Sequence, residues 1–250
     1  MASEVDRYLL AARLGLRGTA GILAIVTGCS REPAQPPPSL PVTSTSVHGV
    51  WRSLFDGRSL QHWRGYRSDR VPAGWQVVEG ALTRVGKAGD LITRDMFGDF
   101  ELELEWMVAE GGNSGIMYRV TEAAAETYQT GPEMQVLDDA RHPDGGSRLT
   151  SAGAVYGLYP APAGVVKPAG EWNAVRIVVR GNQVEHWLNG VEVAEYQLGS
   201  PDWEARVAGS KFRKWPEYGR AAAGHIALQD HGNRVAYRNI RIRTLAPPTG

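Results

Sequence analysis

The sequence predicts an all-β fold, an antiparallel sandwich formed by a single domain. From Phe100 to Trp106, apolar residues alternate with glutamates, as a strand with one buried and one solvated face requires. Short runs of this kind are separated by pairs that favour tight turns, such as Asn189-Gly190. Helical periodicity is nearly absent, and its best candidate, residues 121–128, is short. Many short strands joined by tight turns favour an antiparallel sandwich.

Strand-like segments continue in the second half of the chain. Residues 172–180 place valine and isoleucine at alternate positions, and Gly181-Asn182 predicts a hairpin turn into residues 184–188. Gly232-Asn233 marks a further reversal of the chain. No repeat of fixed period is present, which argues against a propeller or a solenoid. The remaining apolar alternations are formed by Val191, Val193, Ile226, Leu228, Ile240 and Ile242.

The N-terminal segment has the order of an export signal. Arginines within the first 17 residues precede an uncharged run, residues 18–28, that is too short to span a membrane as a helix. Val26-Thr27-Gly28-Cys29 resembles the lipobox of bacterial lipoproteins, in which the cysteine is lipidated. We therefore expect a signal peptide at residues 1–28 and a lipid anchor on Cys29. The alternative is an ordinary hydrophobic helix with an incidental cysteine, and two acidic residues before position 7 count slightly against a signal.

A proline-rich segment separates this start from the predicted domain. Residues 31–41 contain five prolines in eleven positions, a composition that stays extended and hydrated. We expect a disordered linker over residues 29–47 and a single domain over residues 48–245. The expected location is the bacterial cell envelope, with the lipid anchor as the only membrane contact. Ser30 after the cysteine is compatible with the outer membrane, and the periplasmic face is the alternative.

Charge and cysteine content exclude several function classes. Lysine plus arginine and aspartate plus glutamate both total 27, so the chain lacks the basic footprint of a nucleic-acid binder. Cys29 is the only cysteine, which excludes an intrachain disulfide and a cysteine-cluster metal site. Nucleotide-loop, serine-elbow and HExxH motifs are absent from the sequence. A neutral ligand fits this composition best.

Two segments place polar residues on the outer face of predicted strands. If Met134 and Val136 point into the sandwich, then Glu133 and Gln135 point outward. By the same rule, Ile226 and Leu228 point inward and leave His225, Ala227, Gln229 and His231 on the opposite face. We expect the outward polar residues to converge on one concave sheet face. An ordinary solvated face is the alternative, in which Gln229 and Asp230 only hydrogen-bond a turn.

Seven segments, taken in order, resemble the 3-keto-disaccharide hydrolase domain family over residues 50–244. This resemblance implies a concanavalin A-like jelly-roll β-sandwich. The segments are Leu54-Phe55-Asp56-Gly57 with Trp63, Gly112-Asn113-Ser114-Gly115, residues 131–139 (GPEMQVLDD), Glu171-Trp172-Asn173, residues 186–190 (HWLNG), Ser210-Lys211-Phe212 and residues 228–232 (LQDHG).

Some members of the family are 3-keto-glycoside lyases or hydratases. A ketone at C3 acidifies the proton at C2, so the enzyme needs a base, donors for the developing enolate oxygen and an acid for the leaving oxygen at C1. Elimination gives an enone-type glycal, to which water can add. The resemblance implies Glu133 or His231 as the base, with Lys211, Gln229 and Asn113 holding the C3 oxygen. This chemistry requires no metal or redox cofactor.

Further residues are candidates for the walls of a sugar-binding cleft. Arg119, Tyr156 and His142 could contact hydroxyl or ketone groups or present a ring face, as could Gln135. His186 alternates with apolar residues and is expected to be a packed histidine. A divalent cation could bind the cluster of Asp138, Asp139, His142 and Asp144, although these residues could equally form a simple loop.

Three functions remain open: a 3-keto-glycoside lyase or hydratase, a lectin-like sugar-binding lipoprotein, and a structural or interaction lipoprotein. A direct glycosidase is disfavoured, because jelly-roll glucanases place two acids at alternate positions of one strand, whereas Glu133 is followed at that spacing by Gln135. A 3-keto-glycoside lyase or hydratase best accounts for the acid-base groups among the outward residues. A non-catalytic, lectin-like sugar-binding lipoprotein is the main alternative, and a structural or interaction lipoprotein is the third.

Overall fold

The computed structural model describes residues 49–246. The predicted signal peptide of residues 1–28, Cys29 and the predicted linker of residues 29–47 lie outside the described residues. Within the described part, β-strands dominate. One α-helix and three short 3₁₀ helices accompany them: α1 (Pro201–Gly209), η1 (Thr127–Gln129), η2 (Pro143–Gly146) and η3 (Lys211–Lys214).

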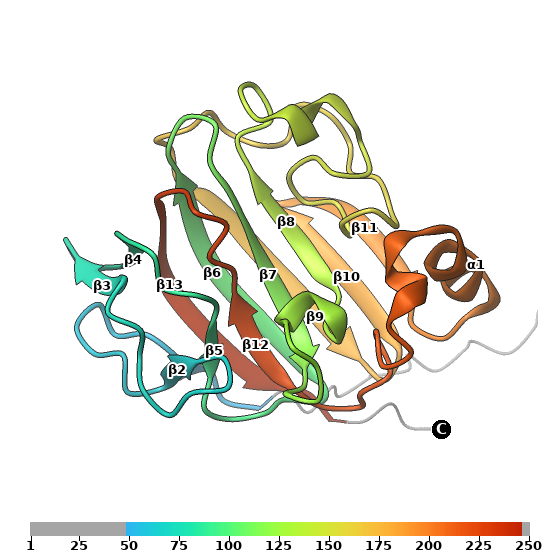
Figure 1. Cartoon of the computed structure of the whole chain (residues 1–250), viewed down its shortest axis with the longest axis horizontal. Helices are drawn as coiled ribbons and strands as arrows, with labels where there is room; N and C mark the ends of the chain where they lie inside the picture. The colour runs from blue at the N-terminus through green and yellow to red at the C-terminus, as the bar shows by residue number, and fades with distance from the viewer. Residues whose placement is uncertain (1–48, 247–250) are drawn as a thin grey trace, which may run out of the picture. The chain divides into compact units, whose positions relative to one another are not determined.

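The strands form two antiparallel sheets, one behind the other in Figure 1. The larger sheet has the order β11-β10-β9-β6-β13-β4-β3, with β1 beside β13, and the smaller has the order β2-β5-β12-β7-β8. The predicted all-β, concanavalin A-like jelly-roll sandwich is therefore confirmed. The strands are β1 (Arg52–Ser53), β2 (Trp63–Gly65), β3 (Trp75–Val78), β4 (Ala81–Arg84), β5 (Leu91–Thr93), β6 (Phe100–Val108), β7 (Asn113–Val120), β8 (Glu133–Leu137), β9 (Asn173–Arg180), β10 (Gln183–Leu188), β11 (Val191–Gln197), β12 (His225–Leu228) and β13 (Val235–Thr244).

The alternation in β6 shows how the sequence builds the core. Its apolar residues from Phe100 to Trp106 are all buried in the hydrophobic core. Its glutamates point to the outer face of the larger sheet, where arginines of β9 and β13 pair with them. This face is less solvated than the sequence predicts, because Arg176 and Arg243 cover Glu101 and leave it only 4% exposed.

A bulge interrupts the alternation where β7 meets β12. The register shifts between His225 and Ala227, and Arg119 on β7 has a φ of 53°. This left-handed conformation is uncommon for a residue with a side chain and reverses the sense of the alternation. Val120 consequently packs with Met117 on the outer face of the smaller sheet, whereas Tyr118 belongs to the inner core.

The helix α1 was not predicted from the sequence, although its start carries ordinary helix signals. Ser200 caps it by accepting a hydrogen bond from the N–H of Trp203, and Pro201 occupies the first turn. Trp203 is fully buried and stacks between Tyr196 and Tyr218, which fixes α1 against the core. The predicted helical segment 121–128 contains only the beginning of η1. No helix within residues 49–246 is both long and apolar enough to cross a membrane.

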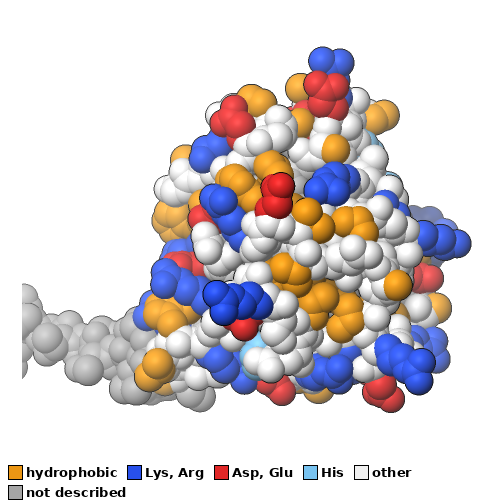
Figure 2. Space-filling view, turned by 90° about the vertical axis from the view of Figure 1, so that its left-hand side faces the viewer, with side chains coloured by type: hydrophobic (Ala, Val, Ile, Leu, Met, Phe, Trp, Pro, Cys, Tyr) orange, Lys and Arg blue, Asp and Glu red, His pale blue; other side chains and the backbone are white. Residues whose placement is uncertain are grey.

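The surface is mixed in charge. Figure 2 shows basic and acidic side chains close to one another, with hydrophobic side chains scattered among them, on the face turned toward the viewer. This distribution agrees with the formal net charge of zero. It provides no single-sign patch on that face for a nucleic acid to bind.

Candidate functional site

The floor of the candidate site is the outer face of the smaller sheet. Strand β7 lies between β8 and β12, and the register places Gly115 opposite Gln135 and Met117 opposite Glu133. Met134, Val136, Ile226 and Leu228 are all fully buried in the sandwich core. Glu133 and Gln135 on β8 therefore emerge on the side away from that core, and Gln229 follows directly after β12, with its backbone N–H donating to the Gly115 carbonyl of β7.

Glu133 and Gln135 are much more enclosed than outward-facing strand residues would be on a bare sheet. Their exposed fractions are 5% and 1%. A segment after β8 folds back along that strand: the N–H of Tyr156 donates to the Glu133 carbonyl, and the N–H of Gly153 donates to the Gln135 carbonyl. The polar face is thus covered at its edge by a loop, which the sequence pattern of the strands does not reveal.

Burial raises the pKa of Glu133 to about 8. Lys211 opposes this shift, whereas Asp90 and Asp144 add to it. The carboxyl lies against Gly115, and a Cβ at that position would overlap its Oε1 atom. Only glycine therefore leaves room for Glu133 in this orientation, and the carboxyl holds its proton to a higher pH than an ordinary glutamate does.

Lys211 is the first residue of η3 and is fixed by the cap of that short helix. The Ser210 hydroxyl accepts a hydrogen bond from the N–H of Phe212 at 3.1 Å. Lys211 as a whole residue is exposed, but its Nζ lies over aromatic rings. The distance from Nζ to the ring centroid is 4.3 Å for Tyr156, 5.2 Å for Phe212 and 5.6 Å for Tyr128. Burial lowers the pKa of Lys211, while Glu133 and Asp144 act in the opposite direction. A cation is thus held over aromatic rings near the carboxyl of Glu133.

The loop after β8 contributes a second polar group around His142. Its Nδ1 accepts a hydrogen bond from the N–H of Asp144 at 3.1 Å, and its Nε2 lies 3.4 Å from the amide nitrogen of Asn113 on β7. The exposed His231 faces it edge-on, with ring centroids 6.3 Å apart. Tyr156 donates from its hydroxyl to Asp144 at 3.4 Å. Burial, with Asp144 and Glu133 nearby, raises the pKa of Tyr156 to about 12, so this hydroxyl stays protonated at neutral pH.

Two amide side chains at the site contain buried atoms without a partner. Neither the Oε1 nor the Nε2 of Gln135 has a hydrogen-bond partner among the described residues, and the Oδ1 of Asn113 also lacks one. Such atoms are uncommon in folded proteins, because each costs about 1–3 kcal/mol. Their position on the site floor makes them suitable for a polar ligand.

Several site residues could not be identified from the strand pattern. Tyr128 of η1 contacts Lys211 and packs edge-on against Trp215, with ring centroids 5.3 Å apart. Asp90, just before β5, accepts hydrogen bonds from the N–H of Asp230 and from the Thr127 hydroxyl. Burial raises its pKa. These residues come from loops distant in sequence, and no local periodicity marks them.

The structure does not bring Arg119 to this group. Its guanidinium donates to the Gly181 carbonyl and lies 3.7 Å from Asp99. The β7 bulge places Arg119 at the hairpin turn, away from the other candidate site residues, and its predicted role in lining a sugar cleft stays a prediction. Asp230 is also structural, since its carboxylate accepts from Arg84 and from two backbone N–H groups of the loop at residues 88–89.

His186 is a packed histidine, as the sequence predicts. It is fully buried, and its Nε2 lies 2.9 Å from the Tyr118 hydroxyl. Burial lowers its pKa to about 4, so it is neutral at physiological pH.

The four residues proposed for a divalent cation mostly organise their own loop. Asp138 accepts from the N–H groups of Gly111 and Ala140, and Asp139 accepts from that of Ala152. Among residues 49–246, no group of three or more His, Cys, Asp or Glu side chains is arranged to hold a metal ion. The simple loop, the other interpretation of this cluster, accounts for these contacts.

The chain matches the model of the 3-keto-alpha-glucoside-1,2-lyase-like domain over residues 50–243. A 3-keto-disaccharide hydrolase from Bacteroides thetaiotaomicron is 37% identical over 225 residues, which cover 77% of this chain and 78% of the relative. A crystal structure of a candidate glycosyl hydrolase from Parabacteroides distasonis aligns with a TM-score of 0.74 and 32% identity, covering 79% of this chain and 94% of that one. A second structure from that organism, also of a candidate glycosyl hydrolase, gives a TM-score of 0.65 and 31% identity, covering 78% and 100%. The chain therefore belongs to the 3-keto-alpha-glucoside-1,2-lyase-like domain family.

Proposed function

We propose that this domain cleaves 3-keto-glycosides by elimination across C1 and C2 of the oxidised sugar, followed by hydration of the product. Membership of the family and similarity to a 3-keto-disaccharide hydrolase support a carbohydrate-active enzyme. The observation that carries the finer proposal is Glu133, a buried carboxyl with a pKa of about 8 beside a lysine and an unpartnered amide. This combination suits removal of a weakly acidic C–H proton more than simple sugar binding.

The reaction assigns one role to each group. Glu133 removes the C2 proton, and the electron pair moves toward the C3 carbonyl to give an enolate. Lys211 stabilises the negative charge on that oxygen, with the Gln135 amide as a further donor. The bond between C1 and the aglycone oxygen then breaks as the C1–C2 double bond forms, and a proton reaches the leaving oxygen. Addition of water across this double bond gives the free 3-keto sugar.

His142 and His231 supply the acid of this scheme. The His142 ring lies beside Asn113, and the His231 ring packs edge-on against that of His142. An imidazole can both donate and accept a proton, which suits protonation of the leaving oxygen or activation of the water. Asn113, Gln229 and Tyr156 would hold sugar hydroxyls. His231 is the alternative base, and the substitutions described below separate it from Glu133. The groups invoked in this reaction require no metal or redox cofactor; whether a divalent cation contributes can be checked by comparing turnover with and without a chelator.

The substrate test uses matched sugars. A panel of 3-keto-glucosides should release aglycone, whereas the unoxidised parents should remain intact, because their C2 proton is not acidic. Deuterium at C2 should slow turnover if proton removal limits the rate. Equal turnover of the parents, or no turnover of any 3-keto sugar, would contradict the lyase. Binding without turnover would instead support the lectin-like alternative.

We further propose that the chain is exported to the bacterial cell envelope and anchored through lipid on Cys29. The support is the order of charged, apolar and lipobox-like segments in residues 1–29. Labelled fatty acid should be incorporated into the wild-type chain and not into Cys29→Ser. Equal processing and equal membrane association of the two chains would contradict the proposal.

A further inference from the structure

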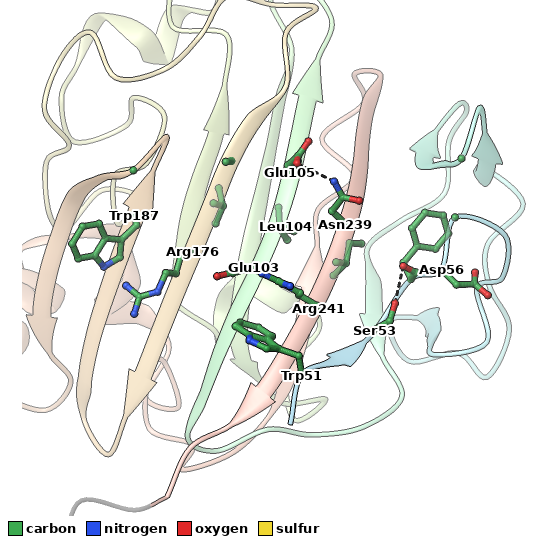
Figure 3. Close-up of a pocket in the computed structure, with 17 residues that line it drawn as sticks. Trp51, Ser53, Asp56, Glu103, Leu104, Glu105, Arg176, Trp187, Asn239 and Arg241 are labelled. Atoms are coloured by element: carbon green, nitrogen blue, oxygen red, sulfur yellow. Dashed lines mark hydrogen bonds and ion pairs between the residues drawn. The ribbon is translucent and has the colours of Figure 1, made fainter. Parts of the chain in front are cut away.

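The outer face of the larger sheet carries a hollow of about 890 Å³ that the proposed reaction does not use (Figure 3). Trp187 on β10 and Trp51, just before β1, are both part of its lining and are both partly exposed. This volume is in the range of pockets that bind small organic ligands. The candidate active site is on the outer face of the other sheet, so the two sites are separated by the sandwich core.

A row of directly opposed residues crosses the floor of this hollow. The register places Trp187 opposite Arg176, Arg176 opposite Glu103, and Glu103 opposite Arg241. Arg241 in turn lies opposite Ser53 on β1. Neighbouring strands are about 4.8 Å apart, so the row from β10 to β1 extends over roughly 19 Å. An elongated ligand would fit this row better than a single sugar ring.

The floor carries positively and negatively charged side chains, which act as hydrogen-bond donors and acceptors. Arg241 donates from its Nε to Glu103 at 2.8 Å, and Asn239 donates to Glu105 at 2.9 Å. A guanidinium has five N–H donors and a carboxylate has two acceptor oxygens, so these pairs keep unused capacity. Because the charges are already paired, the floor favours a neutral ligand whose groups can both donate and accept, as hydroxyls do.

Stacked arginines hold the two indoles in place. The guanidinium carbon of Arg241 lies 4.6 Å from the Trp51 ring centroid, and that of Arg176 lies 5.4 Å from the Trp187 ring centroid. The Trp187 Nε1 also donates to Glu185 at 2.9 Å. Rings that are already ordered lose little entropy when a ligand packs on them. Their apolar faces suit the C–H surfaces of sugar rings, while the floor between them suits the hydroxyls.

We propose that this hollow is a second, non-catalytic binding site for a neutral oligosaccharide. Its occupant would be an unoxidised glycan chain that extends along the row from Trp187 toward Trp51. Such a site would hold the enzyme on a polymer or an oligosaccharide independently of the chemistry on the opposite sheet.

The test is affinity electrophoresis of the purified full-length chain in native gels that contain barley mixed-linkage β-glucan, soluble starch, xyloglucan or galactomannan. At least one polysaccharide should retard the wild-type chain and Glu133→Gln equally. Trp51→Ala and Trp187→Ala should each weaken that binding by about tenfold or more. Arg176→Gln should also weaken it while keeping both indoles, so the result does not depend on a tryptophan variant that folds poorly.

Trp172→Ala is the matched control. Trp172 is also partly exposed and lies 4.0 Å from the guanidinium of Arg238, but it does not line the hollow. Its replacement should leave retardation unchanged, and 3-keto-glucoside turnover should be the same in Trp51→Ala, Trp187→Ala and wild type. No retardation in any gel, an equal loss in Trp172→Ala, or loss in Glu133→Gln alone would overturn the proposal. None of these results depends on whether the lyase assignment holds.

Discussion

Glu101 and Glu133 lie on outer faces of the two sheets and are almost equally buried, at 4% and 5% exposure. Burial alone would raise the pKa of both. In Glu101, hydrogen bonds from Arg176 and Arg243 outweigh burial and lower the pKa. No arginine among residues 49–246 pairs with Glu133, and its pKa rises to about 8. The arginine partners of Glu101, together with the deeper position of Glu133, thus separate a carboxyl that stabilises the fold from one that is available for proton transfer.

The largest expected effect comes from replacing Glu133, the proposed proton-accepting group. Glu133→Gln should lower kcat for a 3-keto-glucoside by about 10²- to 10⁴-fold, as loss of a general base does. Glu101→Gln is the matched control, because it changes the same group on the opposite sheet, and it should retain turnover. Similar loss in both variants would indicate a general effect on folding; loss in His231→Ala with turnover retained in Glu133→Gln would assign the base to His231.

The same substitution should change the pH dependence of stability. The folded-state pKa of Glu133 is raised above its ordinary value of 4.5, so the folded chain holds this proton more tightly than the unfolded chain. Its contribution is fully present below pH 4.5 and is lost as pH rises through about 8. Glu133→Gln should therefore match wild type in unfolding free energy near pH 4 and exceed it near pH 9. Denaturant titrations at the two pH values measure this, and parallel curves would contradict the raised pKa.

The next effect concerns the space that holds Glu133. Gly115→Ala would place a Cβ against the carboxyl and displace it, and a misplacement of this kind should cost on the order of 10²-fold in rate. Gly86→Ala is the control, because a Cβ there meets nothing within 4 Å. Steady-state kinetics of the two variants give the comparison. Full activity in Gly115→Ala would show that the observed orientation of Glu133 is not required.

For Glu101, the carboxyl that is paired with arginines, Glu101→Gln should destabilise the fold at neutral pH. It weakens charged hydrogen bonds from two arginines, and a loss of about 1–3 kcal/mol is expected. Because the pKa of Glu101 is lowered, this difference should shrink as pH falls through the folded-state pKa. Glu103→Gln, which weakens pairing with Arg241 alone, should cost less in the same chemical-denaturation measurement.

The smallest effect is expected at Gln135. Gln135→Leu removes two buried polar atoms without partners, so unfolding free energy should stay the same or rise by about 1 kcal/mol. The KM for a 3-keto-glucoside should rise, since the ligand loses a hydrogen-bonding amide. Gln183→Leu, on the exposed part of β10, controls for the added apolar side chain. Destabilisation specific to Gln135→Leu would show that the amide supports the fold rather than the ligand.

Residues whose environment is set by local alternation could be predicted from the sequence. The inward direction of Met134 and Val136 and the strand predicted over residues 100–106 follow from the two-residue period of a pleated strand. The bulge at Arg119 breaks that period, so the orientation of this residue could not be predicted.

The burial of the Glu133 side chain could not be predicted either, for a different reason. It depends on Tyr156 and on Lys211, which lie 23 and 78 residues later in the chain. Their position is set by the backbone pairing of the loop with β8 and by the packing of α1 through Trp203. A strand pattern contains no information about such partners, so the sequence shows the direction of Glu133 and not its burial.

The pH dependence of kcat/KM for a 3-keto-glucoside tests most directly whether the unpaired buried carboxyl is the base. If Glu133 removes the C2 proton, the rate should rise with pH through about 8. Any falling limb that comes from deprotonation of Lys211 should lie below the ordinary lysine pKa of 10.5, because burial lowers the pKa of this residue. A rising limb near 4.5, the ordinary value for a glutamate, would contradict the raised pKa. A rising limb that disappears in His231→Ala and persists in Glu133→Gln would transfer the role to that histidine and contradict the assignment to Glu133.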